Sequence, residues 1–161
     1  MSQYSGKCTC GAVQYTMHDK PMFVHCCHCT WCQRESGSAF ALNAMIEASK
    51  FSVQGEIESI DTPSNSGRGQ KINRCARCKV ALWSNYAGAA DAVHFVKVGT
   101  LQAGHDIAPD IHIFTSSKQP WVVLPQDTPA VPEYYNPAQY WPQESRDRYK
   151  ANLQNVIAAE R

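Results

Sequence analysis

Hydrophobic and polar residues alternate along much of this chain, and the alternation predicts a protein made mostly of β-strands. Residues 13–17 place Val13, Tyr15 and Met17 on one face with polar residues between them, which is typical of a half-buried strand. Similar patterns predict strands at residues 22–27, 39–46, 51–53, 57–60, 70–74, 80–84, 92–98 and 110–115. The predicted fold class is therefore mainly β.

The last part of the chain has a different pattern. Five prolines between Pro125 and Pro142 predict an extended tail that crosses the surface of the domain. Four aromatic residues of this tail are expected to pack onto the domain: Tyr134, Tyr135, Tyr140 and Trp141. An aromatic side chain of the tail that stays exposed would be suited to the interface of a homodimer.

Residues 143–161 predict the one helix of the chain. Its apolar residues recur at i, i+4, i+7 and i+8, with charges on the opposite face; they are Tyr149, Leu153, Val156 and Ile157. We expect one domain at residues 1–125, with the tail and helix of residues 126–161 packed on it.

Half of the eight cysteines lie in a single stretch, residues 26–32. Cys27, Cys29 and Cys32 have the C-x-C-x₂-C spacing of a tight turn that aims three sulfurs at one point, and we read residues 33–38 as a further turn. Zinc–sulfur bonds of about 2.3 Å require such convergence. No fourth ligand is obvious in the stretch, and three protein ligands with one open position are typical of a catalytic zinc.

Two other interpretations compete with a metal site, namely a buried cysteine core and a disulfide framework. The tight spacing and a second set of cysteines favour metal. On the strand at residues 22–27, Cys26 lies on the face opposite Cys27, which predicts a packed thiol rather than a ligand. His25 shares the face of Cys27, but we favour an ordinary hydrogen-bonded histidine.

The second set consists of two cysteine pairs distant in the sequence. Cys75 and Cys78 form a C-x₂-C turn between two strands, and Cys8 and Cys10 lie in a turn before the strand at residues 13–17. Neither pair has local partners, so the four together predict a closed structural zinc site. Lys79 stands where such turns usually have glycine, which predicts a less regular turn.

Composition and charge narrow the function classes. The 161 residues carry a formal net charge of +1, which does not favour a nucleic acid or an anionic membrane as partner. We find no apolar run long enough for a membrane span and no signal-peptide pattern at the N-terminus. These observations predict a cytoplasmic protein whose cysteines remain thiols unless a metal binds them.

Four motifs together resemble the glutathione-dependent formaldehyde-activating enzyme family, whose domain is shared with centromere protein V. They are GKCTCGAVQY at 6–15, CHCTWCQRESGSAF at 27–40, CARC at 75–78 and HIFTSSKQPW at 112–121. The resemblance implies an Mss4-like zinc-binding β fold of antiparallel sheets, here with a short C-terminal helix. It also implies two zinc ions, a structural one at Cys8, Cys10, Cys75 and Cys78 and a catalytic one at Cys27, Cys29 and Cys32.

The family's reaction is a carbon–sulfur lyase reaction of the S-(hydroxymethyl)glutathione synthase type. A zinc ion with three thiolates suits a thiol in its open position, and glutathione fits that role. The electrophile would be formaldehyde or a related small carbonyl. Arg34, two residues after Cys32, is the candidate contact for glutathione. The basic run at residues 68–79 either binds substrate carboxylates or offsets the charge of the structural site. Ser36, Ser38 and His112 have simpler structural interpretations.

The alternative function is a non-enzymatic zinc module that binds another macromolecule. Methionine sulfoxide reduction, known for a related zinc fold, needs a further nucleophilic cysteine, and no cysteine follows Cys78. We therefore favour the lyase.

Overall fold

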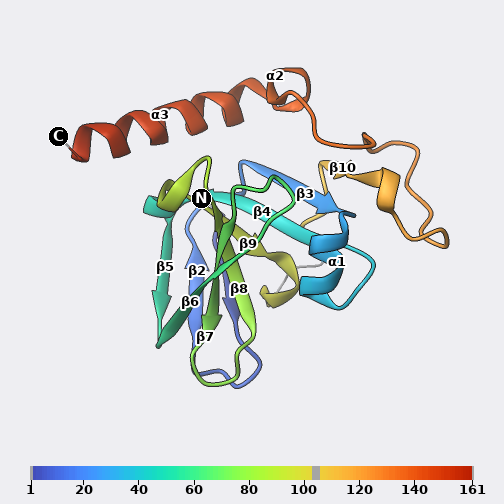
Figure 1. Ribbon diagram of the computed structural model, residues 1–161. Helices are drawn as coiled ribbons and strands as arrows, with labels where there is room; N and C mark the ends of the chain where they lie inside the picture. The colour runs from blue at the N-terminus through green and yellow to red at the C-terminus, as the bar shows by residue number, and fades with distance from the viewer. Residues whose placement is uncertain (1, 103–105, 161) are drawn as a thin grey trace.

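Two β-sheets form the body of the protein, as the computed structural model shows for residues 2–102 and 106–160 (Figure 1). The smaller sheet has the order β1-β2-β5 and the larger the order β10-β3-β4-β9-β8-β7-β6. The strands are β1 (Tyr4–Lys7), β2 (Gln14–Met17), β3 (Phe23–Cys27), β4 (Ala41–Glu47), β5 (Phe51–Gln54), β6 (Ile57–Thr62), β7 (Gln70–Cys75), β8 (Ala81–Tyr86), β9 (Val93–Lys97) and β10 (Ile111–Ile113). The prediction of a mainly β fold is confirmed. Among the described strands only the β10–β3 pairing is parallel, so the larger sheet is mixed rather than purely antiparallel.

The first hydrophobic cluster joins the two sheets. Tyr15 and Met17 of β2 are 3% and 0% exposed and pack in one cluster with residues of β3, β4, β8 and β9. Gln14, which alternates with them, is exposed. The predicted alternation of residues 13–17 is thus confirmed, and it directs β2 onto the larger sheet.

A second cluster combines strand residues of the larger sheet with the C-terminal part of the chain. Phe23 of β3 and Met45 of β4 pack in it with Tyr135 and Trp141 of the tail. All five residues of β3 are buried, and some belong to the first cluster and others to the second. Of the other two tail aromatics, Tyr140 is 37% exposed and Tyr134 is 55% exposed.

Three α-helices occur in the described residues: α1 (Thr30–Ser36), α2 (Pro137–Tyr140) and α3 (Gln143–Ala159). Short 3₁₀ turns are η1 (Ala48–Lys50), η2 (Ala90–Ala92), η3 (Val98–Thr100) and η5 (Thr115–Ser117). The prediction of a single helix, with turns at residues 27–32 and 33–38, was wrong. Helix α1 buries none of its residues, so it carries no apolar period that the sequence could reveal. Its ends are instead set by Cys29 at the N-cap and Gly37, with φ of 65°, at the C-cap.

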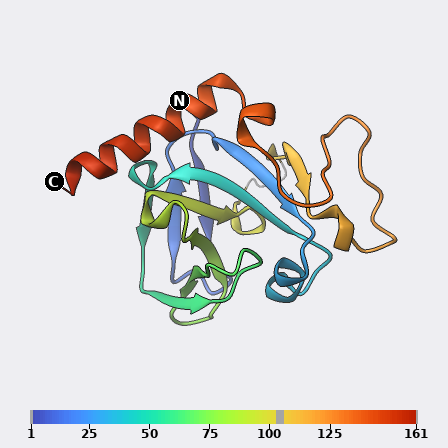
Figure 2. The same cartoon turned by 45° about the horizontal axis from the view of Figure 1, so that its top comes forward.

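Helix α3 runs along one side of the molecule, and its last turns project past the strands (Figures 1 and 2). Tyr149, Leu153 and Val156 pack against the second cluster as predicted. Ile157 is 54% exposed, so its predicted place on the buried face was wrong. None of the described helices is long and apolar enough to cross a membrane.

An ion pair ties α3 to the end of β4. Arg148 donates to both carboxylate oxygens of Glu47, from Nε at 2.8 Å and from a terminal nitrogen at 2.7 Å. The side chains are 12% and 5% exposed. Burial raises the pKa of Glu47, but the hydrogen bonds from Arg148, a backbone hydrogen bond and the charges of Arg148 and Lys50 together hold this pKa below its ordinary value.

We expect Arg148→Met to lower the free energy of unfolding by about 3 kcal/mol at pH 7, because it leaves a buried carboxylate without its main partner. Glu47 has a depressed pKa in the folded state, so its stabilising contribution is complete above the pKa of about 4.3 of an unfolded glutamate and is lost as the pH falls. The difference between wild type and variant should therefore shrink below about pH 4. Urea unfolding of wild type and variant, at pH 7 and below about pH 4, measures this difference. Lys150→Met, at an exposed position of the same helix, is the control; an equal loss in both variants would contradict the role of the pair.

Candidate metal centre

The first cysteine cluster joins the turn before β2 to the turn between β7 and β8. The sulfurs of Cys8, Cys10, Cys75 and Cys78 all lie within 4.8 Å of one another. The Cys8 and Cys10 sulfurs are 3.6 Å apart, and those of Cys10 and Cys75 are 3.8 Å apart. A tetrahedron of sulfurs around zinc, with bonds of about 2.3 Å, has edges of about 3.8 Å. The four side chains therefore fit a metal ion of zinc's size.

Backbone amides support negative charge on these sulfurs. The N–H of Val13 donates to the Cys8 sulfur at 3.3 Å, and the N–H of Cys78 donates to the Cys75 sulfur at 3.4 Å. Backbone N–H groups of Cys10 and Val80 lower the pKa of Cys78 to about 6. Burial raises the pKa of Cys8, but hydrogen bonds from the Val13 N–H and from the thiols of Cys10 and Cys75 outweigh it, and the pKa is lowered. Such thiols ionise readily, as metal ligands must.

Lys79 keeps the backbone shape of the cysteine turn. Its φ is 67°, in the left-handed region that glycine normally occupies, and its N–H donates to the Cys75 carbonyl at 2.9 Å. The cysteine turn is therefore as regular as one with glycine at this position. Lys79 instead holds a strained backbone conformation, because its Cβ disfavours a positive φ. The Lys79 ammonium pairs with Glu58 at 2.7 Å.

The second cluster lies where β3 runs into α1. The sulfurs of Cys27, Cys29 and Cys32 lie within 4.8 Å of one another, and no fourth His, Cys, Asp or Glu of the described residues joins them. Cys29 caps the helix, and its sulfur accepts the N–H of Cys32 at 3.3 Å. Hydrogen bonds from the thiols of Cys27 and Cys32 lower the pKa of Cys29 to about 3, and the pKa of Cys27 is correspondingly raised. The chain thus stabilises a thiolate at the N-terminus of α1.

The two histidines next to this cluster have other partners. The His25 ring nitrogen Nε2 lies 2.5 Å from the Tyr135 hydroxyl, as expected of a hydrogen-bonded histidine. His28 is fully buried, and its Nε2 lies 3.0 Å from Nδ1 of His112. Cys26, which is 2% exposed, has its sulfur 3.5 Å from the same His28 nitrogen.

Cys26, His28 and His112 thus form a third group of potential metal ligands, which sequence reasoning missed. It depends on the parallel pairing that sets His112 beside Cys26, and no local spacing reveals that pairing.

The carbonyl of His28 is the hydrogen-bond centre of the cysteine loop. It accepts from the Gln33 amide at 2.8 Å and from the Ser117 hydroxyl at 2.9 Å. The Gln33 amide also donates to the Ser117 carbonyl, and its own oxygen accepts from Gln119 at 2.7 Å. Residues 115–119 of the fourth motif therefore hold the loop between Cys27 and Cys32 in place.

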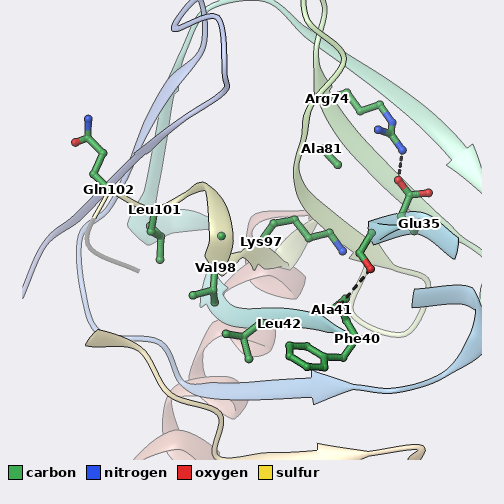
Figure 3. A pocket seen from close by; sticks show the side chains of 12 residues that line it. Glu35, Phe40, Ala41, Leu42, Arg74, Ala81, Lys97, Val98, Leu101 and Gln102 are labelled. Carbon is green, nitrogen blue, oxygen red and sulfur yellow. Dashed lines mark hydrogen bonds and ion pairs between the residues drawn. The ribbon is translucent and has the colours of Figure 1, made fainter. Parts of the chain in front are cut away.

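A pocket of about 640 Å³ adjoins α1 (Figure 3). Its wall includes Glu35, which forms an ion pair with Arg74 of β7, and Lys97 of β9. The Lys97 side chain extends across the pocket toward the Glu35 end of α1 (Figure 3). Burial lowers the pKa of Lys97, and negative charge on Cys32 acts in the opposite direction. Sequence reasoning missed Lys97 because a lone lysine in a strand has no spacing signal.

The remaining predicted contacts lie near the cluster without touching its sulfurs. Arg34 is exposed on α1 and is not among the residues that line the pocket, so its role as a glutathione contact stays a prediction. The Ser36 hydroxyl donates to the carbonyl of Cys32 at 2.8 Å, which is the structural role favoured above. In the basic run, Arg74 and Lys79 pair with Glu35 and Glu58.

Comparison with known proteins shows the family of this chain. Residues 3–117 match the family described as glutathione-dependent formaldehyde-activating enzyme. The chain belongs to this family. All seven cysteines of the two clusters lie within the matched residues, as does the histidine pair His28 and His112. The family match supports an activity of the formaldehyde-activating type that depends on glutathione.

The other comparisons add little. A crystal structure of a Rhodobacter sphaeroides protein is similar to this chain at 20% sequence identity and a TM-score of 0.45. The similarity covers 65% of this chain and 91% of that one. The search of curated proteins gives no match.

Lys79→Gly should relieve the strain in the cysteine turn. The exposed pair with Glu58 is worth at most about 1 kcal/mol, so the substitution is best made in a Glu58→Gln background. There, Lys79→Gly should raise the free energy of unfolding by about 1 kcal/mol, because glycine tolerates a positive φ. Denaturant unfolding with zinc present measures it. Lys79→Ala, which keeps the Cβ, should bring no gain; an equal gain from alanine would refute strain as the cause.

Proposed function

We propose that this protein is a zinc-dependent carbon–sulfur lyase that joins a thiol such as glutathione to formaldehyde, or releases it from the adduct. Cys27, Cys29 and Cys32 would hold the catalytic zinc, and Cys8, Cys10, Cys75 and Cys78 a structural one. The family match over residues 3–117 supports the reaction type. The proposal adds the metal, its ligands and the roles of the two clusters.

One observation carries the proposal, namely that three convergent sulfurs lack a fourth protein ligand among the described residues. His25 and His28 are the nearest candidates in the sequence, but neither is grouped with the three sulfurs, and the Nε2 atoms of their rings contact Tyr135 and His112. An open coordination position is the feature that distinguishes catalytic from structural zinc sites.

The donor set suits a thiol substrate rather than water. Zinc bound by three thiolates is a soft centre that would favour a further sulfur ligand and lower the pKa of that thiol. The reaction itself is a simple addition. The substrate thiol gives up its proton, its sulfur forms a bond to the carbonyl carbon of formaldehyde as the carbonyl π bond breaks, and the oxygen takes up one proton, giving S-(hydroxymethyl)glutathione; the reverse breaks the same carbon–sulfur bond.

The chain's own residues prepare this addition in two ways. The α1 N-terminus and the N–H of Cys32 stabilise negative charge on Cys29. Lys97 provides a positive charge near the cluster. Tyr86 remains a protonated phenol, because burial and the charges of Cys32 and Cys27 raise its pKa. The site thus favours an anionic sulfur, with a positive charge and a neutral phenol near it.

Protein purified without chelator should contain two zinc ions per chain, measured by elemental analysis. Cys75→Ser should lower the free energy of unfolding by at least about 5 kcal/mol, since metal binding at a closed site is coupled to folding. Cys29→Ser should lose one zinc and keep the fold. If both variants unfold alike, the division into structural and catalytic sites is wrong.

Cys26→Ser is the matched control for these variants, because Cys26 lies next to Cys27 but its sulfur contacts His28 instead. It should retain both zinc ions. Loss of one zinc in this variant would make Cys26 a ligand and exclude the proposed set.

The open position is tested by X-ray absorption at the zinc edge. The average number of sulfurs per zinc should be below four without added thiol and should rise when glutathione is added. Binding should weaken as the pH falls, because protons compete with zinc for the thiol. A formaldehyde-adduct assay on the same samples should show activity that Cys29→Ser abolishes. A zinc shell that glutathione leaves unchanged would favour a non-enzymatic zinc module instead.

A further inference from the structure

The pocket beside α1 is lined by residues that neighbour the three-cysteine cluster, although the three cysteines themselves do not line it. Glu35 and Ser36 line it, and they lie three and four residues after Cys32, about one helical turn further along α1. On the other side, Ala41 lines the pocket and is the direct register partner of Cys27. A ligand whose sulfur sits at the cluster would therefore have this pocket next to it.

One carboxylate, Glu35, and two basic side chains, Arg74 and Lys97, line the pocket. Glu35 and Arg74 neutralise each other in an ion pair. Lys97 has no carboxylate within 4.0 Å in the part of the chain that the structure describes, and its ammonium donates one hydrogen bond, to the Asn43 side chain at 3.1 Å. Because an ammonium has three donors, two remain for a ligand. The pocket thus offers one positive charge that no carboxylate of the described residues contacts.

The rest of the wall is largely apolar. Phe40, Leu42, Val98 and Leu101 line the pocket around Lys97 (Figure 3). Its volume of about 640 Å³ lies in the range of small-molecule sites. Apolar walls suit the methylene and peptide-like portion of a ligand, while the ammonium fixes an anionic group.

We propose that Lys97 binds a carboxylate of the thiol substrate, so that this pocket selects thiols that carry an acid group at a distance from the sulfur. This inference rests on the proposed function, because the substrate sulfur must occupy the three-cysteine cluster. Lys97 acts here as a specificity-determining residue.

The competing role for Lys97 is that of a counter-charge to the cysteine thiolates. In that role it would strengthen the binding of every thiol by the same factor, whatever the rest of the ligand carries. A carboxylate contact strengthens only the acid. The two roles therefore differ in the ratio of affinities for an acid and a neutral thiol.

The test compares 3-mercaptopropionate with its methyl ester. Calorimetry on the zinc-loaded protein gives the dissociation constant of each, expressed per thiolate from the known acidity of each thiol. The wild type should bind the acid about tenfold more tightly or better, as expected for a hydrogen bond to a charged group. In Lys97→Met this preference should fall to about one, while Lys97→Arg should keep part of it. Lys71→Met, at an exposed position of β7, should behave as wild type.

Each result decides the question. Equal affinity of the wild type for acid and ester would overturn the inference, and this holds even if a Lys97 variant fails to fold. A uniform loss for both ligands in Lys97→Met would also overturn it and assign Lys97 to charge compensation. If neither thiol binds the zinc-loaded wild type, the proposed function itself fails. If the ester binds as well as the acid, only the selection by Lys97 fails.

Discussion

The carbonyl of His28 is the constraint on which the site geometry depends. It lies between two cysteines of the cluster, and it accepts hydrogen bonds from Gln33 on α1 and Ser117 on η5. The N–H of the same residue donates to the Ile113 carbonyl of β10. These bonds connect β3, α1 and the segment after β10, so the three sulfurs keep their positions relative to the sheet. Without these hydrogen bonds, the loop would lose conformational entropy when a metal binds, and metal binding would be weaker.

The two cysteine clusters differ in how the fold closes them. The four-cysteine cluster draws on two turns about 65 residues apart, so its formation and the folding of the domain are one event. The three-cysteine cluster is local, and its last sulfur sits on a helix that buries none of its own residues. Arg74, next to Cys75, pairs with Glu35 on that helix and so links the two clusters through a partly buried ion pair.

The strands were largely predictable because each is a short run of strand-forming residues, with a clear period of two in β2 and continuous burial in β3. Residues 13–17, 51–53 and 57–60 lie within or next to strands of the structure. Helix α1 was missed because cap interactions rather than an apolar face define it. Lys97 and the His28–His112 contact were missed because both depend on which strands are neighbours, and single-strand patterns do not specify neighbours.

By itself, the sequence predicted the mainly β fold, the division of seven cysteines into a set of three and a set of four, and the opposite orientations of Cys26 and Cys27. Spacing within each cysteine turn and alternation along a strand are local properties of the backbone, so residue order alone specifies them; the two distant pairs were joined because neither has local partners. Only the tertiary structure decided what fills the space around the sulfurs. The β4–β9 register brings Lys97 beside Asn43, and the parallel β10–β3 pairing brings His112 beside Cys26. Such contacts join residues tens of positions apart, and they exist only once the sheet is assembled.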